Sequence, residues 1–445
     1  MLLEFRVENY RSFKDELIFS MTPNKMQKDL AFSIQKEQIG NKEYSALSSA
    51  VIYGPNASGK TNIITAMDTF RTILLRGNIK NADSMTHVNP AANNLELIPF
   101  CEDEVPCPVS FAIKFTNKDV LIDYSLQMDL GIFLDKDYER SIINETLSIN
   151  GVMIFERKNN SLKINVNSIN DFLNASVEQN LESADIISQN GLNSTDLFLT
   201  NGFKSIFSTK IVALIHDWIE NKFMVICRAN SMQVVRKFVD PKDGTIYVEK
   251  TLSEAAKEFG INSNELGFKP VNEGLESVLF SIFKKNLAIP AELFESYGTI
   301  RFVNEFPLII RALITGSILV MDEFDASIHP MALMNIINIF HNDEINIRHA
   351  QLVFNTHNPI FLNGNLFRRD EIKFVEKDEV THKSTQYSLA DFKTFGSNGV
   401  RKSDDYMKHY FVNRYGAIKE VDFVPIIESI MKNMGAQNDE QKKNN

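Results

Sequence analysis

The apolar positions of this chain follow two strand patterns. Near the N-terminus, Leu3, Phe5 and Val7 alternate with charged residues, which predicts a strand with one buried face. Elsewhere the apolar residues are continuous, which is typical of strands buried on both faces. The clearest continuous runs cover residues 50–53, 318–321 and 352–354. Because doubly buried strands belong to parallel sheets covered by helices, the pattern predicts an α/β fold.

The remaining apolar residues predict two further regions. Runs at 109–115, 120–128 and 146–149, with a turn at 117–119, predict an antiparallel sheet that forms a β lobe. Between residues 170 and 222 the apolar spacing is mainly helical and is clearest from Leu214 to Ile219, so a helical subdomain is expected there.

Composition narrows the class of protein. The chain has 445 residues, of which 44% are hydrophobic, so it can bury a large core. No continuous apolar stretch reaches the ~18 residues that cross a bilayer, so we expect a cytoplasmic protein with no membrane contact. The net charge of −10 gives no global attraction to nucleic acid, so nucleic acid would bind at a local patch or through a partner.

The run at 50–53 leads directly into a glycine-rich loop. The loop residues are Gly54, Pro55, Asn56, Ala57, Ser58, Gly59, Lys60 and Thr61, followed by Asn62. Gly, four residues, then Gly-Lys-Thr is the spacing of a phosphate-binding loop, in which backbone amides surround the phosphates. Lys60 would contact the β- and γ-phosphates of ATP, and the Thr61 hydroxyl would bind Mg²⁺. The alternative is a glycine-rich turn that binds nothing.

Acidic and imidazole side chains follow the other two buried strands. Asp322 and Glu323 end the run at 318–321, where the first carboxylate can support Mg²⁺ and the second can polarise the attacking water. His357 follows the run at 352–354, at the end of the strand where ligands bind in parallel sheets. The alternatives are a solvated acidic turn and a structural histidine.

Taken together, these motifs resemble a known family. The ordered set of 54–61, 295–299, 318–323, 325–330 and 355–357 is similar to the ABC-type ATPase heads of the SMC and RecF group. It resembles more closely the AAA-annotated ABC-type ATPases of bacterial abortive infection and phage defence, such as the RloA-like proteins. The resemblance implies an ABC-type P-loop ATPase head with an inserted antiparallel β lobe and a helical subdomain.

The resemblance also implies site residues and a division of the chain. Ser296 and Gly298 correspond to the ABC signature and would close over ATP bound to a second copy, in a homodimer or higher oligomer. Glu323, His357 and Lys60 would be catalytic. The alternative for 296–299 is a plain turn before the apolar helix 303–313. The expected parts are 1–100 and 276–435 as the head, 101–160 as the β lobe, 161–275 as a mainly helical insert, and 436–445 as a polar tail.

Three functions fit such an ATPase. The first is regulation of a separately encoded effector, typically a nuclease, in anti-phage defence. The second is repair or binding of DNA ends, which the lack of sustained heptads between residues 160 and 270 makes less favoured. The third is a transporter ATPase, which the N-terminal pattern and the signature argue against. The acidic pairs 370–371 and 378–379 are expected to form a solvated face rather than a nuclease site.

Overall fold

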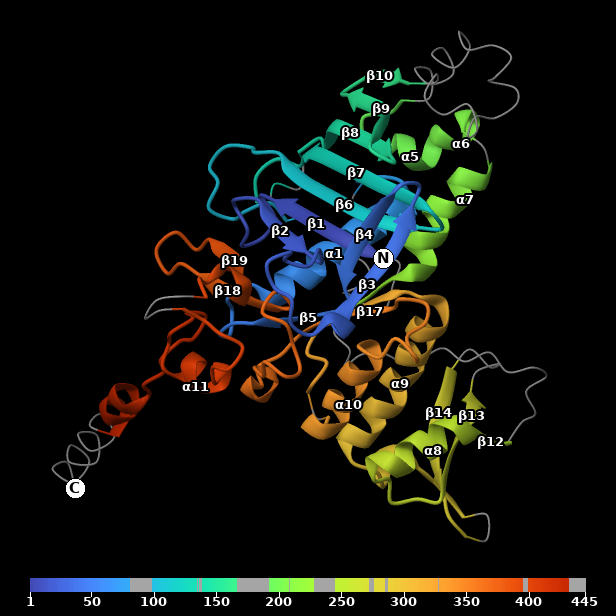
Figure 1. Cartoon of the computed structure of the whole chain (residues 1–445), viewed down its shortest axis with the longest axis vertical. Helices are drawn as coiled ribbons and strands as arrows, with labels where there is room; N and C mark the ends of the chain where they lie inside the picture. Colours follow the sequence, from blue (N-terminus) through green and yellow to red (C-terminus); the bar gives the residue numbers. More distant parts are fainter. Residues whose placement is uncertain are drawn as a thin grey trace, which may run out of the picture.

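The computed structural model describes residues 1–80, 98–133, 135, 138–165, 192–207, 209–227, 245–271, 276–284, 287–326, 328–394 and 399–431. Its centre is a six-stranded sheet (Figure 1). In order across the sheet, the strands are β11 (Phe223–Ile226), β16 (Ile318–Met321), β17 (Gln351–Asn355), β5 (Ser49–Tyr53), β18 (Ile372–Lys377) and β19 (Ser384–Ser388). The first five are parallel and β19 is antiparallel to β18, which confirms the predicted α/β class.

Strand β5 is buried on both faces, as its continuous apolar run predicts. Ala50 and Ile52 belong to the hydrophobic cluster that includes helix α1 (Lys60–Arg76). Val51 and Tyr53 belong to the cluster on the opposite face, where helices α9 (Tyr297–Thr315) and α10 (Pro330–Phe340) pack. Helix α1 ends at a glycine with φ 73°, Gly77, because an L-residue is strained in that left-handed conformation.

Helix α1 lies between the central sheet and a seven-stranded antiparallel sheet (Figure 1). In order, the strands of this sheet are β10 (Ser161–Ile164), β9 (Val152–Lys158), β8 (Ser141–Ile149), β7 (Val120–Asp129), β6 (Val109–Asn117), β1 (Leu2–Glu8) and β2 (Leu17–Ser20). The predicted antiparallel lobe is confirmed. Its boundaries are wider than 101–160, because β1 and β2 complete it by pairing with β6 and with each other.

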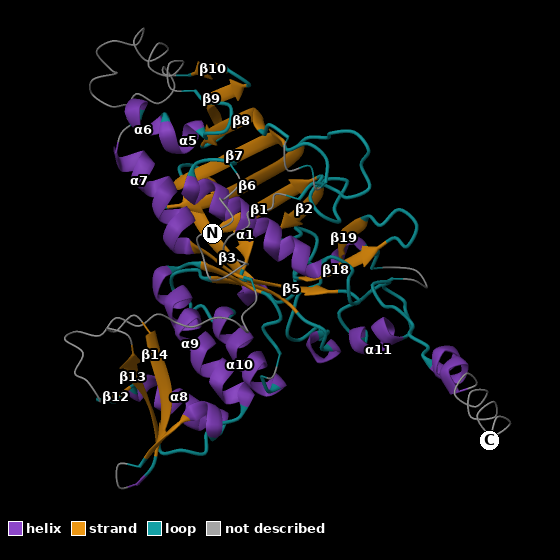
Figure 2. Cartoon of the chain, turned by 180° about the vertical axis from the view of Figure 1, so that it is seen from behind, coloured by secondary structure: helices purple, strands orange, loops and turns teal. Residues whose placement is uncertain are grey.

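The range 161–275 also differs from the expected mainly helical insert. Its described helices are α5 (Phe198–Asn201), α6 (Phe203–Ile206), α7 (Thr209–Asp217) with a π-helical end (Trp218–Lys222), and α8 (Lys250–Phe259). Strand β11 interrupts them and pairs with β16, so this piece belongs to the central sheet. Strands β12 (Tyr247–Val248), β13 (Glu265–Val271), β14 (Glu276–Ile282) and β15 (Ala288–Pro290) form a separate sheet that packs with α8. The helical part is therefore divided into two pieces (Figure 2).

The remaining described elements are short. They are the hairpin of β3 (Ile34–Ile39) and β4 (Lys42–Leu47), helix α11 (Tyr406–Phe411), single 3₁₀ turns at 31–33, 291–293, 359–361 and 389–391, and a helical segment at 424–431. Among the described residues, no helix combines the length and apolarity needed to cross a bilayer. The expected polar tail, 436–445, lies outside the described residues.

One acidic pair expected on the surface is buried. Asp370 binds the guanidinium of Arg368 at 2.8 Å, and Glu371 accepts a hydrogen bond from the Ser49 hydroxyl at 2.8 Å. The prediction of a solvated face was wrong at 370–371 because these carboxylates close the amino end of β5 and β18 and are satisfied there by buried partners.

Candidate functional site

The phosphate loop connects β5 to α1 and adopts the strained conformations that its glycines allow. Gly54 has φ 159° and Gly59 has φ 111°, and Ala57 between them also has a positive φ. A Cβ on Gly59 would lie 2.7 Å from the Ser384 hydroxyl and 2.8 Å from the Ser12 hydroxyl. The loop therefore fits only glycine at position 59, and its backbone lies at the start of a 17-residue helix, where anions bind favourably.

Lys60 is buried within the loop that it ends. Its ammonium donates to the carbonyl oxygens of Gly54 at 2.7 Å and Pro55 at 2.9 Å. Burial lowers the pKa of Lys60 to about 8, and Asp322 and Glu323 oppose that shift. The side chain is thus a desolvated cation held beside two carboxylates, which is a favourable place for a phosphate oxygen.

The acidic strand end faces the phosphate loop. The Thr61 hydroxyl donates to Asp322 Oδ1 at 3.0 Å, which places the two predicted metal ligands side by side. Asn355, at the end of β17, donates to the same Asp322 oxygen at 2.5 Å and accepts from the backbone N–H of Glu323 at 2.5 Å. One buried amide therefore fixes both acidic residues.

Glu323 has an unusual backbone and an exposed side chain. Its φ is 51°, a conformation that few residues other than glycine adopt. Its N–H is held by Asn355 and its carbonyl accepts from the guanidinium of Arg301, a buried residue of α9. The carboxylate is thus directed toward solvent beside Lys60 by a backbone that two other elements hold in place.

His357 lies beside the same group of charges. Partial desolvation and the Lys60 ammonium lower the pKa of His357, while Asp325 and Glu323 oppose the shift. Asp325 is held by the hydroxyl of Thr356 at 2.6 Å, and burial raises the pKa of its carboxyl group. A neutral imidazole can donate one hydrogen bond to an oxygen in the site.

The signature-like residues lie at the start of α9. Ser296 is exposed, and its hydroxyl accepts from the Thr299 N–H at 3.1 Å and bonds with the Thr299 hydroxyl at 2.8 Å. The helix begins at Tyr297, so Gly298 and Thr299 lie in its first turn rather than before it. The structure thus brings together Lys60, Thr61, Asp322, Glu323 and His357, whereas Ser296 is engaged by its own helix.

The arrangement fits Mg²⁺ and a nucleotide without a protein-only metal cage. Among the described residues, no group of three or more His, Cys, Asp or Glu side chains is placed to hold a metal ion by itself. Mg²⁺ suits such a site, since it commonly takes one or two protein ligands, here Thr61 and Asp322, plus phosphate and water oxygens. The buried hydroxyl of Ser58, inside the loop, has no hydrogen-bond partner in the structure. It is therefore free to donate a hydrogen bond to a phosphate oxygen.

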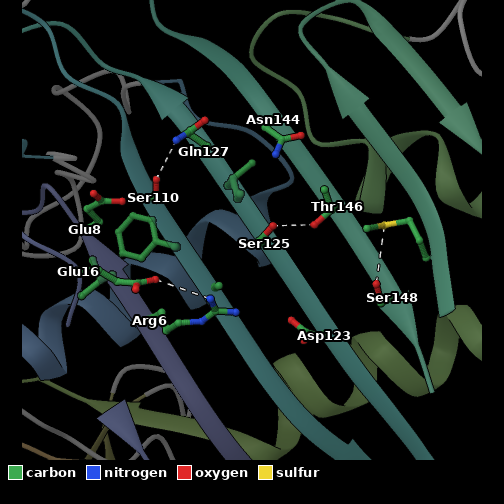
Figure 3. A pocket seen from close by; sticks show the side chains of 15 residues that line it. Arg6, Glu8, Glu16, Ser110, Asp123, Ser125, Gln127, Asn144, Thr146 and Ser148 are labelled. Atoms are coloured by element: carbon green, nitrogen blue, oxygen red, sulfur yellow. Dashed lines mark hydrogen bonds and ion pairs between the residues drawn. The ribbon is translucent and has the colours of Figure 1, made fainter. Parts of the chain in front are cut away.

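A groove of about 400 Å³ crosses the outer face of the antiparallel sheet, on β1, β6, β7 and β8 (Figure 3). Its polar side chains bond to one another, as Gln127 does with Ser110 at 3.2 Å and Ser125 with Thr146 at 2.6 Å. An antiparallel sheet commonly exposes one such polar face. The groove is lined by residues of the lobe and by none of the phosphate-loop residues.

The fold and the loop define a P-loop protein of the α/β class. Over residues 49–363, the sequence matches the model of the family described as "AAA domain, putative AbiEii toxin, Type IV TA system", and the chain belongs to that family. No curated protein matches the chain in sequence.

Three solved structures similar to this chain are Smc heads. The first is the Smc head bound to the C-winged helix domain of ScpA, with 12% identity, coverage of 87% of this chain and 97% of that chain, and a TM-score of 0.39. The second is the SMC head domain from Thermotoga maritima, with 14% identity, coverage of 87% and 98%, and a TM-score of 0.34. The third is the Smc head with an extended coiled coil bound to the C-terminal domain of ScpA from Pyrococcus furiosus, with 11% identity, coverage of 88% and 97%, and a TM-score of 0.36.

Two residues of the site were not predicted from the sequence. Asn355 was part of a recognised motif but had no assigned role, and Arg301 lies before the predicted apolar helix 303–313, in a part of α9 that was not predicted to be helical. For Asn355 the signal was its position at the end of a strand next to β16, because Met321 pairs with Phe354 and the next residues therefore face each other.

Proposed function

We propose that the chain is an ATPase that binds Mg²⁺ and ATP at the phosphate loop. The observation that carries this proposal is the contact of Thr61 with Asp322, beside Lys60 and Glu323. Backbone amides of Gly54–Asn62 would hold the phosphates, with Lys60 on the β- and γ-oxygens. Mg²⁺ would be held by Thr61 and Asp322 and would neutralise phosphate charge.

Hydrolysis is assigned to Glu323 and His357. Glu323 would accept a proton from the attacking water, and its fixed backbone and exposed carboxylate support that role. His357 would hold a γ-phosphate oxygen through its donor nitrogen. Glu323→Gln should keep ATP binding and lower kcat about 10²- to 10⁴-fold. Full activity of this variant would exclude Glu323 as the base.

The site is proposed to be completed by a second copy of the chain. A phosphate loop covers one side of ATP, and Ser296 is exposed rather than bonded into its own site. Large apolar side chains next to it in the sequence are also exposed: Leu293 is 79% exposed and Tyr297 is 56% exposed. Exposed apolar residues beside a polar site favour a protein interface. A two-fold dimer would use this surface twice, with Ser296 and Gly298 facing the partner's nucleotide.

Mixing two inactive variants tests the shared site. Lys60→Ala removes the loop cation, and Ser296→Arg places a bulky side chain where the partner's nucleotide would bind. Heterodimers of the two contain one intact composite site, so ATPase activity should partly return on mixing. Full activity of Ser296→Arg alone would exclude the shared site. Unchanged ATP affinity of Lys60→Ala by calorimetry would overturn the phosphate-loop assignment.

The proposed role of the ATPase is cytoplasmic regulation of a separately encoded effector, such as a nuclease, in anti-phage defence of the RloA-like kind. The family description names the AbiEii toxin of a toxin–antitoxin system, which supports a defence role. The C-terminal segment supports a protein partner, because apolar residues of this segment are exposed: Val421, Phe423, Val424, Ile426, Ile427, Ile430 and Met431. A short helix with an uncovered apolar face gains stability by packing into a groove of another protein.

Co-purification with the product of the neighbouring gene tests this role. Ile426→Asp combined with Ile430→Asp should release the effector and leave basal ATPase activity unchanged. Val105→Asp is the control, because Val105 is also an exposed apolar residue and lies in the loop before β6. Retention of the effector by the double variant would refute the C-terminal contact. ATPase activity that DNA stimulates, with no protein partner, would favour the alternative of a DNA-repair ATPase.

A further inference from the structure

Helix α9 is joined to the catalytic turn by one buried arginine. Arg301 lies in the second turn of α9, is 4% exposed, and donates through Nη2 to the carbonyl oxygen of Glu323 at 2.5 Å. Its Nε donates to Glu305 Oε1, one helical turn further on, at 2.8 Å. The guanidinium therefore bridges α9 and the turn that follows β16.

The pair of Arg301 and Glu305 has an unfavourable desolvation free energy and holds the guanidinium in one orientation. Glu305 is almost fully buried, its second carboxylate oxygen has no hydrogen-bond partner in the structure, and burial raises the pKa of Glu305 to about 7. A carboxylate is seldom buried for stability alone, since a buried pair repays its desolvation poorly. Its contact fixes the orientation of the planar guanidinium, which then directs Nη2 at Glu323.

Ser296 caps the same end of α9, five residues before Arg301. The same helix thus holds the residue proposed to touch the partner's nucleotide and the arginine that touches its own Glu323. A helix moves as a rigid rod over five residues, so a displacement of Ser296 is passed to Arg301. Glu323 is sensitive to such a displacement, because its left-handed backbone depends on bonds from Arg301 and Asn355.

We propose that Arg301 is a positioning residue that couples the two ATP sites of the dimer. When Ser296 of one protomer meets the nucleotide bound by its partner, α9 shifts and Arg301 sets the carbonyl, and hence the carboxylate, of Glu323 in the first protomer. Each site is then activated by occupancy of the other. This inference rests on the proposed shared site and adds a direction of communication that the shared site alone does not require.

Steady-state ATPase kinetics of Arg301→Met test the coupling. The wild type should show a Hill coefficient for ATP between 1 and 2, the number of coupled sites in a dimer. Arg301→Met should lower kcat about tenfold, the loss expected when one contact that orders the catalytic group is removed. Its Hill coefficient should fall to 1, with ATP binding unchanged by calorimetry. Arg301→Lys should recover part of kcat and of the cooperativity.

Arg311→Met is the matched control, because Arg311 is an exposed arginine of the same helix. It should leave the rate and the Hill coefficient unchanged. If Arg301→Met destabilises the fold, Arg301→Met combined with Glu305→Gln removes the unpaired buried charge and allows the same measurement. Cooperativity that persists in these variants, or a wild type that hydrolyses ATP as a dimer without cooperativity, would overturn the coupling. Full activity of Ser296→Arg alone would instead refute the shared site itself.

Discussion

Asn355→Ala is the most informative single substitution at the acidic strand end. Asn355 is 1% exposed and makes two hydrogen bonds at 2.5 Å, one to the carboxylate of Asp322 and one from the N–H of Glu323. Alanine removes both and leaves the Glu323 N–H without its partner. A bond to a charged group contributes about 1.5–3 kcal/mol and a neutral one about 1 kcal/mol, so the variant should lose about 2–4 kcal/mol of folding free energy.

The effect on catalysis should exceed what the loss of stability explains. Glu323 would keep only the Arg301 contact on its strained peptide. A shift of the base by about 1 Å can cost up to about 100-fold in rate. We therefore expect kcat to fall about 10- to 100-fold, which corresponds to about 1.4–2.7 kcal/mol in activation free energy. ATP affinity should change little, because the phosphate loop is untouched.

Asn346→Ala provides the matched control. Asn346 is also buried and makes three hydrogen bonds, with Phe340 and Ala350, near the opposite end of the same strand. Its loss should destabilise the fold at least as much, measured by urea unfolding, while single-turnover hydrolysis stays at the wild-type rate below the transition. If Asn355→Ala loses stability but keeps kcat within about twofold, or if both variants lose kcat equally, the positioning role is refuted.

Three further predictions test other parts of the structure. Glu145→Ala should destabilise the lobe by about 3–5 kcal/mol in urea unfolding, because Arg157 is buried beside it, whereas Glu156→Ala, beside the exposed Lys158, should leave the unfolding midpoint nearly unchanged. Folding raises the pKa of Glu305 from 4.5 to about 7, so the folded protein keeps the Glu305 proton to a higher pH than the unfolded chain does. The free energy of unfolding should therefore fall by on the order of 3 kcal/mol as the pH rises from 4.5 to 7. Glu305→Gln has no such proton, so the difference in unfolding free energy between wild type and this variant should change with pH by that amount. Gly59→Ala should abolish ATP binding by calorimetry through the clash with Ser384 and Ser12, whereas Gly40→Ala, with nothing within 4 Å, should leave binding intact.

The sequence predicts the site best where the motif is contiguous. The loop 54–61 follows a strand that the apolar run at 50–53 predicts, and the structure ends this strand at Tyr53 and continues the loop into helix α1. The spacing of apolar residues within each short segment determines such elements. The contact of Asp322 with Thr61 spans 261 residues, and it was expected only because both motifs end parallel strands.

Pairing and contacts between residues far apart in the sequence were harder to predict. Strand β1 has the alternation of a half-buried strand, but only its pairing with β6 assigns it to the lobe. Strand β11 has four residues and follows a helical pattern directly, so local spacing could not separate it from the helices. Glu371 was expected to be exposed to solvent because charged side chains usually lie on the surface. Its burial depends on Ser49, 322 residues away, and no local signal carries that information.

Contacts between residues far apart in the sequence also hold the phosphate loop from two sides. Ser12, in the turn between β1 and β2 of the lobe, accepts from the Asn62 amide at 2.7 Å. Ser384, at the start of β19, donates to the carbonyl of Ser58 at 2.6 Å, and its own N–H donates to the carbonyl of Ser12 at 2.7 Å. The antiparallel sheet and the edge of the central sheet therefore meet at the loop. Because these bonds tie the loop to both sheets, a change in the relation of lobe and central sheet must alter the loop backbone, and nucleotide binding must in turn restrain that relation.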